Sequence, residues 1–237
     1  YGAIEFYKKA KKAGVKPIIG IESYVMPEDP KDTERYYHLI LLCKNETGWK
    51  NLLKLVTHSY LEGHYYKPRI NKNYLREHSD GLIALSACLS GEIGRNILNH
   101  RFAEAEKIAL DYQKIFSPGN YYLEIGHHPG IKETVEARRG VIELSKKTGI
   151  PIAATQDIHY LNKDDAEYHD ILLAVQTGNK LDDPDRLTLK NDDFSMRSPE
   201  EMGELFQDVP EAVTNTQLIA EKCNLELDFK QTHLPKF

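Results

Sequence analysis

Four short apolar stretches of this chain contain or end in a side chain that can bind a metal ion. Asp157 and His159 directly follow the run PIAAT and are two residues apart, so in an extended segment they point to the same side. Glu22 lies inside GIESYV, His38 lies inside YYHLILLC, and Cys88 ends LIALSAC. Carboxylate, imidazole and thiolate groups are the usual protein ligands of zinc and related transition metals.

Each of these residues also has a role that needs no metal. Without a metal, Asp157 is explained as a carboxylate in a turn and His159 as an imidazole on the surface. Glu22 is then explained as a residue at a strand end that faces solvent. His38 and Cys88 fit a hydrogen-bonded core imidazole and a small buried apolar residue. Cys88 as a covalent nucleophile would need a nearby histidine base, which its local sequence does not supply. Because four separate strands each carry such a residue, the metal interpretation gains weight.

A second group of side chains is a candidate for binding substrate. Lys67 and Arg69 in YYKPRI are suited to contacts with phosphates. His127 and His128 follow the run YYLEIG and would line the same end of the fold. Solvated turns explain all of these residues equally well.

The stretches that must position these side chains alternate between helix and strand. Apolar spacing predicts helices over residues 4–13, 45–61, 101–116, 131–148, 163–176 and 199–223. Apolar runs predict strands over residues 17–25, 36–43, 82–87, 121–126 and 151–155. Such alternation favours a mainly parallel α/β sheet or barrel, whose active site lies beyond the carboxyl ends of the strands.

Composition limits the classes of protein to consider. The 237 residues are 41% hydrophobic and 28% charged, which excludes intrinsic disorder of the whole chain. No apolar run approaches the roughly 18 residues of a membrane span. The net charge of -5 is unlike that of a non-specific nucleic-acid binder, unless bound cations supply the positive field. Three cysteines without a CxxC motif favour a reducing compartment, and we expect the cytoplasm.

Several ordered motifs resemble one known family. The runs KPIIGIESYV, HLILLCKNETGWKNLLKL, EGHYYKPRI, GLIALSACLSGEI, AATQDIHYL and LLAVQTGNKLDDPDR are similar to the polymerase-and-histidinol-phosphatase (PHP) domain of bacterial DNA polymerase III alpha subunits. The resemblance covers nearly the whole chain. It implies a distorted seven-stranded (β/α) TIM-like barrel over residues 1–198, followed by a helical exit segment over residues 199–237 that leads toward the polymerase palm.

The resemblance also implies a set of metal ligands. The family positions carry over to Glu22, His38, Cys88, Asp157 and His159, with Glu22, Asp157 and His159 in the catalytic centre. The implied cluster is di- or trinuclear and contains zinc, manganese or both. The family begins with a strand that bears His-x-His and a second strand that ends in Asp-His-Gly. Neither motif occurs here, so we expect the chain to lack the first two strand-helix units and to be weakly active by itself.

The implied function is DNA replication. The family resemblance indicates metal-dependent phosphodiester hydrolysis, with 3′-5′ proofreading exonuclease activity in the intact domain, attached to a magnesium-dependent DNA-directed DNA polymerase. The implied partners are the 3′ end of a DNA primer, the remainder of the alpha subunit and other replicase subunits. Lys67, Arg69 and His128 are then candidate substrate contacts, and no membrane is involved.

Three other interpretations remain open. The domain is in one case a structural platform that stabilises the polymerase core and docks a separate proofreading exonuclease. In another it is a stand-alone small-molecule phosphatase of the PHP type, although the long segment after residue 177 argues against this. In the third it is an unrelated α/β barrel whose polar strand ends are accidental.

Overall fold

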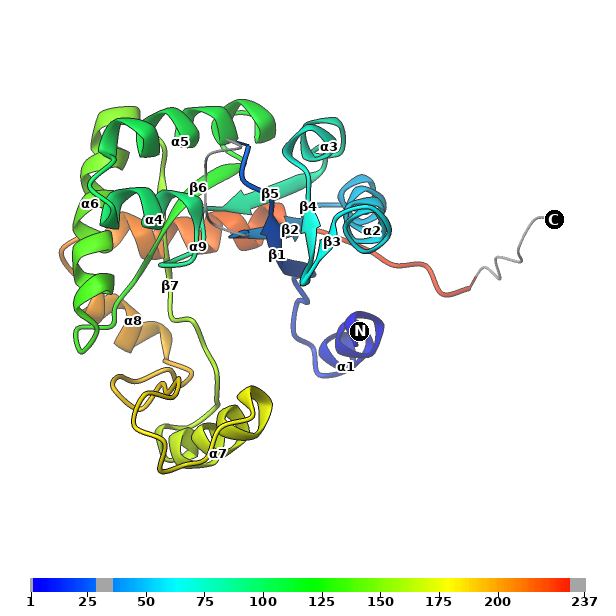
Figure 1. The fold of residues 1–237 in the computed structure, drawn as a ribbon. Helices are drawn as coiled ribbons and strands as arrows, with labels where there is room; N and C mark the ends of the chain where they lie inside the picture. Colours follow the sequence, from blue (N-terminus) through cyan, green and yellow to red (C-terminus); the bar gives the residue numbers. More distant parts are fainter. Residues whose placement is uncertain (1, 29–35, 231–237) are drawn as a thin grey trace. The chain divides into compact units, whose positions relative to one another are not determined.

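The computed structural model describes residues 2–28 and 36–230, and Figure 1 shows the order of their helices and strands. These residues form two compact units that interleave along the sequence. Unit 1 contains residues 1–85, 111–121 and 218–237, and unit 2 contains residues 86–110 and 122–217. The polar sequence EDPKDTER at residues 28–35 predicts a loop, and all of it except Glu28 lies outside the described residues. The expected domain division at residue 198 stays a prediction.

Unit 1 is built on a mixed sheet. Its strands are β1 (Gly20–Val25), β2 (Tyr37–Cys43), β3 (His64–Tyr65), β4 (Lys67–Ile70) and β5 (Leu82–Leu85), in the spatial order β3-β4-β1-β2-β5. The side chains of β2 alternate between buried and half-buried positions, as expected for a strand with one face on the core. Leu39, Leu41 and Cys43 form its buried face.

The direction of β2 differs from the expected parallel arrangement. It runs antiparallel to both of its neighbours, β1 and β5, whereas β1 and β4 are parallel. A physical reason lies in the length of the connection, because only residues 26–36 join β1 to β2 and a parallel pair needs a crossover of about a dozen residues or more. As a result, the amino end of β2 lies beside the carboxyl end of β1.

Helices pack onto this sheet. Unit 1 contains α1 (Ala3–Lys12), α2 (Glu46–Leu61) and α3 (Lys72–Glu77), together with the end of α5 (Phe102–Phe116) and the end of α9 (Pro210–Lys222). Asn45 caps α2 by accepting a hydrogen bond from the backbone N–H of Gly48 at 3.0 Å. Leu52 and Leu55 of this helix are buried, and α2 contacts β2, β4 and β5.

Unit 2 contains a parallel strand–helix–strand arrangement. Strands β6 (Tyr121–Gly126) and β7 (Ile152–Thr155) pair in parallel, and α6 (Lys132–Thr148) is the crossover that joins them. Its other elements are α4 (Glu92–Leu98), most of α5, the short η1 (Lys163–Asp165), α7 (Ala166–Thr177), α8 (Pro199–Leu205) and most of α9. Every residue of β6 is buried, which explains its continuous apolar sequence.

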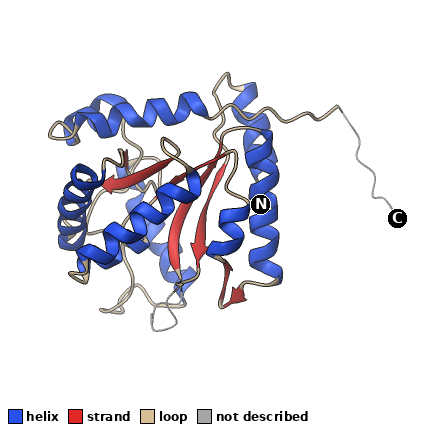
Figure 2. Ribbon diagram, turned by 90° about the horizontal axis from the view of Figure 1, so that it is seen from above, coloured by secondary structure: helices blue, strands red, loops and turns tan. Residues whose placement is uncertain are grey.

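The predicted elements are confirmed within a few residues, apart from some differences at their ends. The helix expected over residues 199–223 is interrupted between α8 and α9, and Pro210 begins α9. The strands and the helix between residues 64 and 77 had no expected counterpart because they are short. Figure 2, with helices in blue and strands in red, shows the mixed α/β composition.

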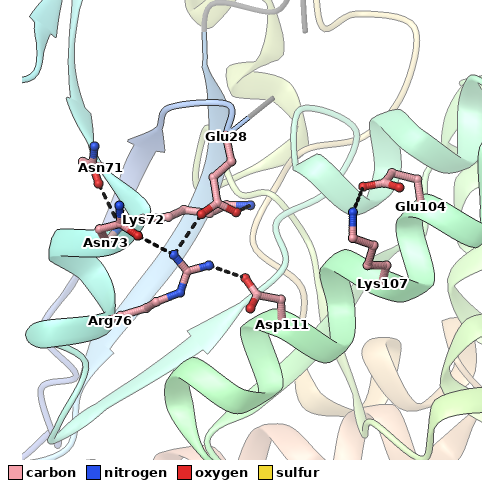
Figure 3. A network of polar contacts seen from close by, with 8 residues as sticks. All are labelled: Glu28, Asn71, Lys72, Asn73, Arg76, Glu104, Lys107 and Asp111. Atoms are coloured by element: carbon pink, nitrogen blue, oxygen red, sulfur yellow. Dashed lines mark hydrogen bonds and ion pairs between the residues drawn. The ribbon is translucent and has the colours of Figure 1, made fainter. Parts of the chain in front are cut away.

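Unit 1 contains a polar network around Arg76 that Figure 3 shows from close by. The guanidinium of Arg76 donates to Glu28 at 2.9 Å and to Asp111 at 2.8 Å. The buried ammonium of Lys72 lies 3.4 Å from Glu28 and 4.8 Å from the ring centre of Tyr112. This network joins the end of β1, the helix α3 and the helix α5.

We expect Arg76→Met to lower the free energy of unfolding by about 1 kcal/mol, because Arg76 is only partly exposed and joins two carboxylates. Urea denaturation monitored by circular dichroism measures this change. The matched control is Lys107→Met, which removes the exposed pair with Glu104 that is also drawn in Figure 3. Equal effects of the two substitutions would contradict a structural role of the Arg76 network.

Candidate metal centre

Glu22 and His38 form a close pair on neighbouring strands of unit 1. His38 Nδ1 lies 2.6 Å from Glu22 Oε1. In the register of the sheet Tyr24 lies opposite His38, so Glu22 is its diagonal neighbour on the same face. His38 is the second residue of β2, as expected for a residue inside the run YYHLILLC, and lies near the amino end of that strand. The antiparallel pairing nevertheless brings it to the carboxyl half of β1.

Aromatic rings and basic residues lie near this pair. The ring centre of Tyr24 lies 5.1 Å from that of His38, and Lys67 Nζ lies 6.0 Å from the centre of the Tyr24 ring. Arg69, by contrast, places its guanidinium 5.0 Å from the ring centre of Tyr65. Lys67 is therefore near Tyr24, the aromatic neighbour of His38. Contacts of either residue with phosphate stay predictions.

Asp157 and His159 form the corresponding pair in unit 2. His159 Nε2 lies 3.3 Å from Asp157 Oδ1, and both side chains are partly exposed. Asp157 has φ of 51°, in the left-handed region, so the segment is not extended at this point. The bend of the backbone at Asp157, and not the expected extended geometry, therefore brings the two side chains together. Such strained backbone is common at functional sites.

The segment around Phe194 holds this pair in place. The backbone N–H of His159 donates to the carbonyl of Phe194 at 3.0 Å. Gln156 Nε2 donates to the carbonyl of Asp193 at 2.9 Å. The His159 ring also lies against the edge of the Phe194 ring, with the ring centres 5.7 Å apart. The turn-rich region before α8, which contains Asp193 and Phe194, thus has a structural role, because it supports the Asp157–His159 pair.

Cys88 follows β5 after a second left-handed residue, Ala87, with φ of 57°. Burial, followed by the charge of Glu124, raises the pKa of the Cys88 thiol to about 12. At neutral pH this side chain is therefore a thiol, unless a bound cation holds it as a thiolate.

Glu124 is a candidate functional residue that the sequence analysis did not select. It is buried on β6, and its Oε1 accepts a hydrogen bond from the hydroxyl of Thr155 at 2.8 Å. Its backbone N–H donates to the hydroxyl of Ser86 at 2.8 Å. The signal was present, because a carboxylate inside the apolar run YYLEIG is as unusual as Glu22 inside GIESYV.

His127 and His128 differ in their surroundings. His127 lines a cavity of about 360 Å³ beside α6, together with Thr134, Arg138, Arg139 and other residues. Burial and the neighbouring Arg138 lower the pKa of His127. His128 is 3% exposed, and its ring stacks on Phe194 at 4.3 Å between centres. A direct contact of His128 with substrate stays a prediction.

The structure thus brings the expected ligands together as pairs within each unit. Glu22 and His38 meet in unit 1, and Asp157 and His159 meet in unit 2. Cys88, also in unit 2, is influenced electrostatically by Asp157. Within residues 2–28 and 36–230, no three His, Cys, Asp or Glu side chains come together as a complete metal site. The union of both pairs in one centre stays a prediction.

The sequence of this chain is similar to that of one known protein family. The family model described as PHP domain matches residues 1–128. This chain belongs to the PHP domain family. Over 98% of its length it is 48% identical to the DNA polymerase III subunit alpha of Borreliella burgdorferi. The corresponding subunits of Helicobacter pylori strain 26695 and of Thermus aquaticus are 46% and 42% identical over 97% and 100% of the chain.

This PHP domain chain spans about a fifth of the length of the curated relatives it matches. The activities and partners of those longer proteins are therefore only proposed for this chain. In the part of the chain that the structure describes, no helix has both the length and the apolar character that crossing a bilayer requires.

Proposed function

We propose that this chain is the PHP region of a replicative DNA polymerase III alpha subunit, where it takes part in metal-dependent hydrolysis of phosphodiesters at the 3′ end of DNA. The observation that carries the proposal is that the ligand residues implied by the family occur as close pairs, Glu22 with His38 and Asp157 with His159. The names of the relatives favour this function over a stand-alone small-molecule phosphatase. The distorted seven-stranded barrel is part of this proposal.

The donor set fits a metal cluster of zinc or manganese. It combines two imidazoles, two carboxylates and a thiol, which is the mixed set that suits zinc, with manganese at an oxygen-rich position. A buried imidazole without hydrogen-bond partners, His128, lies beside Cys88 and supports the fit. Among the described non-glycine residues with left-handed backbone, Ala87 precedes Cys88 and Asp157 is itself a candidate ligand, whereas His100 and Ser117 are not next to any candidate ligand in the sequence. When bound, the cluster would supply Lewis acidity and a more acidic water to the reaction.

The residues of the chain then have distinct tasks. Glu22 in unit 1 and Asp157 in unit 2 would each supply negative charge that attracts divalent cations, and the imidazoles of His38 and His159 complete each pair. Lys67, near the Glu22–His38 pair, is placed to attract a phosphate of the DNA strand. Bound cations would also make an acidic chain compatible with a DNA 3′ end.

A second function, as a platform for the polymerase core or for a separate exonuclease, is favoured by one observation. Helix α7 exposes Tyr168, Leu172 and Val175, which are spaced as neighbours along one helical face. Monomeric proteins rarely leave such apolar stripes uncovered. The two functions are compatible, because the stripe and the Asp157–His159 pair involve different side chains.

The test is removal of metal from the full-length subunit. We expect a chelator to reduce the release of nucleotides from a 3′-labelled primer by at least about 100-fold, and zinc or manganese to restore it. The polymerase reaction, assayed with added magnesium, serves as a control for folding. Hydrolysis that persists unchanged in metal-free protein would contradict the proposed function, and intact binding of replicase partners would then favour the platform.

A further inference from the structure

His128 is the most unusual buried polar residue of unit 2. Its side chain is 3% exposed, and neither ring nitrogen has a hydrogen-bond partner among the described residues. Burying an imidazole without partners costs free energy, because the lost hydrogen bonds to water are not replaced. Buried polar groups in native proteins generally have a partner, so this imidazole needs one, such as an ordered water molecule or a cation.

The two nitrogens face chemically different neighbours. His128 Nδ1 lies 3.7 Å from Oδ1 of Asp192. Asp192 is itself fixed, because its carboxylate accepts hydrogen bonds from the backbone N–H groups of Gly130 and Asp193, both at 2.7 Å. With its proton on Nδ1, the imidazole would direct this N–H toward Asp192. The lone pair would then be on Nε2.

The Nε2 side of the ring is next to Cys88. A Cβ atom added to Gly126 would lie 3.7 Å from His128 Nε2 and 3.7 Å from Cys88 Sγ. Gly126 therefore leaves a small gap between an imidazole nitrogen and a sulfur atom. The carbon Cδ2 of His128 would be 3.3 Å from the same point, so even one methyl group would crowd the ring.

We propose that His128 is a further ligand of the metal centre, binding through Nε2 the same cation as Cys88. A carboxylate on the opposite ring nitrogen is the usual arrangement around metal-bound histidine, where it fixes the tautomer and the ring orientation. Asp192 has this position, and stacking on Phe194 holds the plane of the ring. Gly126 is required because a side chain there would occupy the space between the two donors. The inference rests on the proposed metal-dependent function.

The experiment compares His128→Phe with His127→Phe in the full-length subunit. Phenylalanine keeps the ring volume and the stacking on Phe194 but removes both nitrogens, and His127 is the adjacent histidine, at the cavity beside α6. We expect His128→Phe to weaken zinc binding by at least about 10-fold, or to remove one equivalent of zinc in elemental analysis. His127→Phe should retain the wild-type zinc content. Asp192→Asn, which keeps the size of the side chain, should weaken zinc binding less than His128→Phe.

Cobalt substitution gives a readout that does not depend on activity. At cobalt concentrations high enough to fill the weakened site, charge-transfer absorption from the Cys88 thiolate to cobalt should be present in His128→Phe, while the d–d bands shift because one nitrogen ligand is lost. Melting temperatures distinguish a metal ligand from a residue that only supports the fold. In chelator, the melting temperature of His128→Phe should be no lower than that of the wild type. In zinc, it should be lower than that of the wild type.

Three results are decisive. Loss of zinc in His128→Phe, with zinc retained in His127→Phe, supports the inference. Wild-type zinc content and cobalt spectrum in His128→Phe, with zinc lost in Cys88→Ser, overturn it and leave the proposed function standing. Absence of bound zinc and manganese from the wild-type subunit overturns both. If His128→Phe fails to fold in chelator, the inference is judged on Asp192→Asn, whose unchanged zinc affinity would overturn it.

Discussion

Substituting Asp157 by alanine in the full-length subunit should remove metal and hydrolytic activity together. We expect at least about a 100-fold lower rate of nucleotide release and a lower content of zinc or manganese. The reason is that Asp157 has a left-handed backbone conformation and that its carboxylate lies 3.3 Å from His159 Nε2, so its loss removes half of the candidate ligand pair. His159→Ala should have the same two effects.

The measurement combines elemental analysis with a 3′-labelled primer assay on the same preparations. Asp164→Ala is the matched control, since Asp164 is an exposed acidic residue on the neighbouring η1 turn and should change neither quantity. An Asp157→Ala protein with reduced hydrolysis but unchanged metal content would contradict the assignment of Asp157 as a ligand. Equal losses in the control would indicate a general effect of charge.

The second large effect concerns the stability of unit 2. We expect Arg186→Met to lower the melting temperature by several degrees, because it leaves the largely inaccessible carboxylate of Asp170 without its cation. Arg186 donates two hydrogen bonds to Asp170, at 2.7 and 2.6 Å, and both side chains are nearly buried. Thr188 adds a third hydrogen bond to the same carboxylate at 2.7 Å.

This effect should depend on pH in a defined direction. Hydrogen bonds from Arg186 lower the pKa of Asp170 to about 2, below its ordinary value of 3.8. The ion pair therefore stabilises the folded state fully above about pH 4, and this stabilisation is lost as the pH falls through 2. The difference in melting temperature between wild type and Arg186→Met should accordingly shrink between pH 5 and pH 2.

Thermal denaturation at several pH values measures both predictions. The control Lys147→Met breaks an exposed ion pair with Glu106 in the same unit and should change stability by less than 1 kcal/mol at any pH. The double variant Arg186→Met with Asp170→Leu should recover part of the loss, because it removes the unpaired charge. A destabilisation by Arg186→Met that is independent of pH would contradict the role of the Asp170 carboxylate.

The stability of this ion pair also bears on the metal centre. Asp170 lies on α7, and Arg186 and Thr188 belong to the turn-rich segment that continues to Phe194. Phe194 accepts the backbone hydrogen bond from His159. Arg186→Met should therefore weaken metal binding as well, by less than Asp157→Ala does.

The sequence predicted most of the elements because their apolar spacing is regular. Helices α2, α5 and α6 and strands β2, β6 and β7 are found where the spacing indicates them. The antiparallel direction of β2 was missed because apolar runs carry no information on strand direction, which depends on the connection. The fold around β3, β4 and α3 was missed because such short elements have too few residues for a period to be detected.

The candidate site was predictable in its residue types and less so in its geometry. The spacing of Asp157 and His159 indicated a pair, although the bend at Asp157 that forms it is a property of the tertiary structure. Glu124 was overlooked, although a carboxylate in an apolar strand is visible in the sequence. The environment of His128 was not predictable, because it is formed by Asp192 and Phe194, which are distant from His128 in the sequence.

Anomalous X-ray scattering from crystals of the full-length subunit grown with zinc tests the central claim most directly. Maps calculated from data above and below the zinc absorption edge locate bound zinc independently of the protein model. We predict difference peaks within coordination distance of Glu22, His38, Cys88, Asp157 and His159. Peaks located away from these side chains, or none in crystals that contain zinc, would contradict the assignment of this PHP domain as a metal-dependent hydrolase.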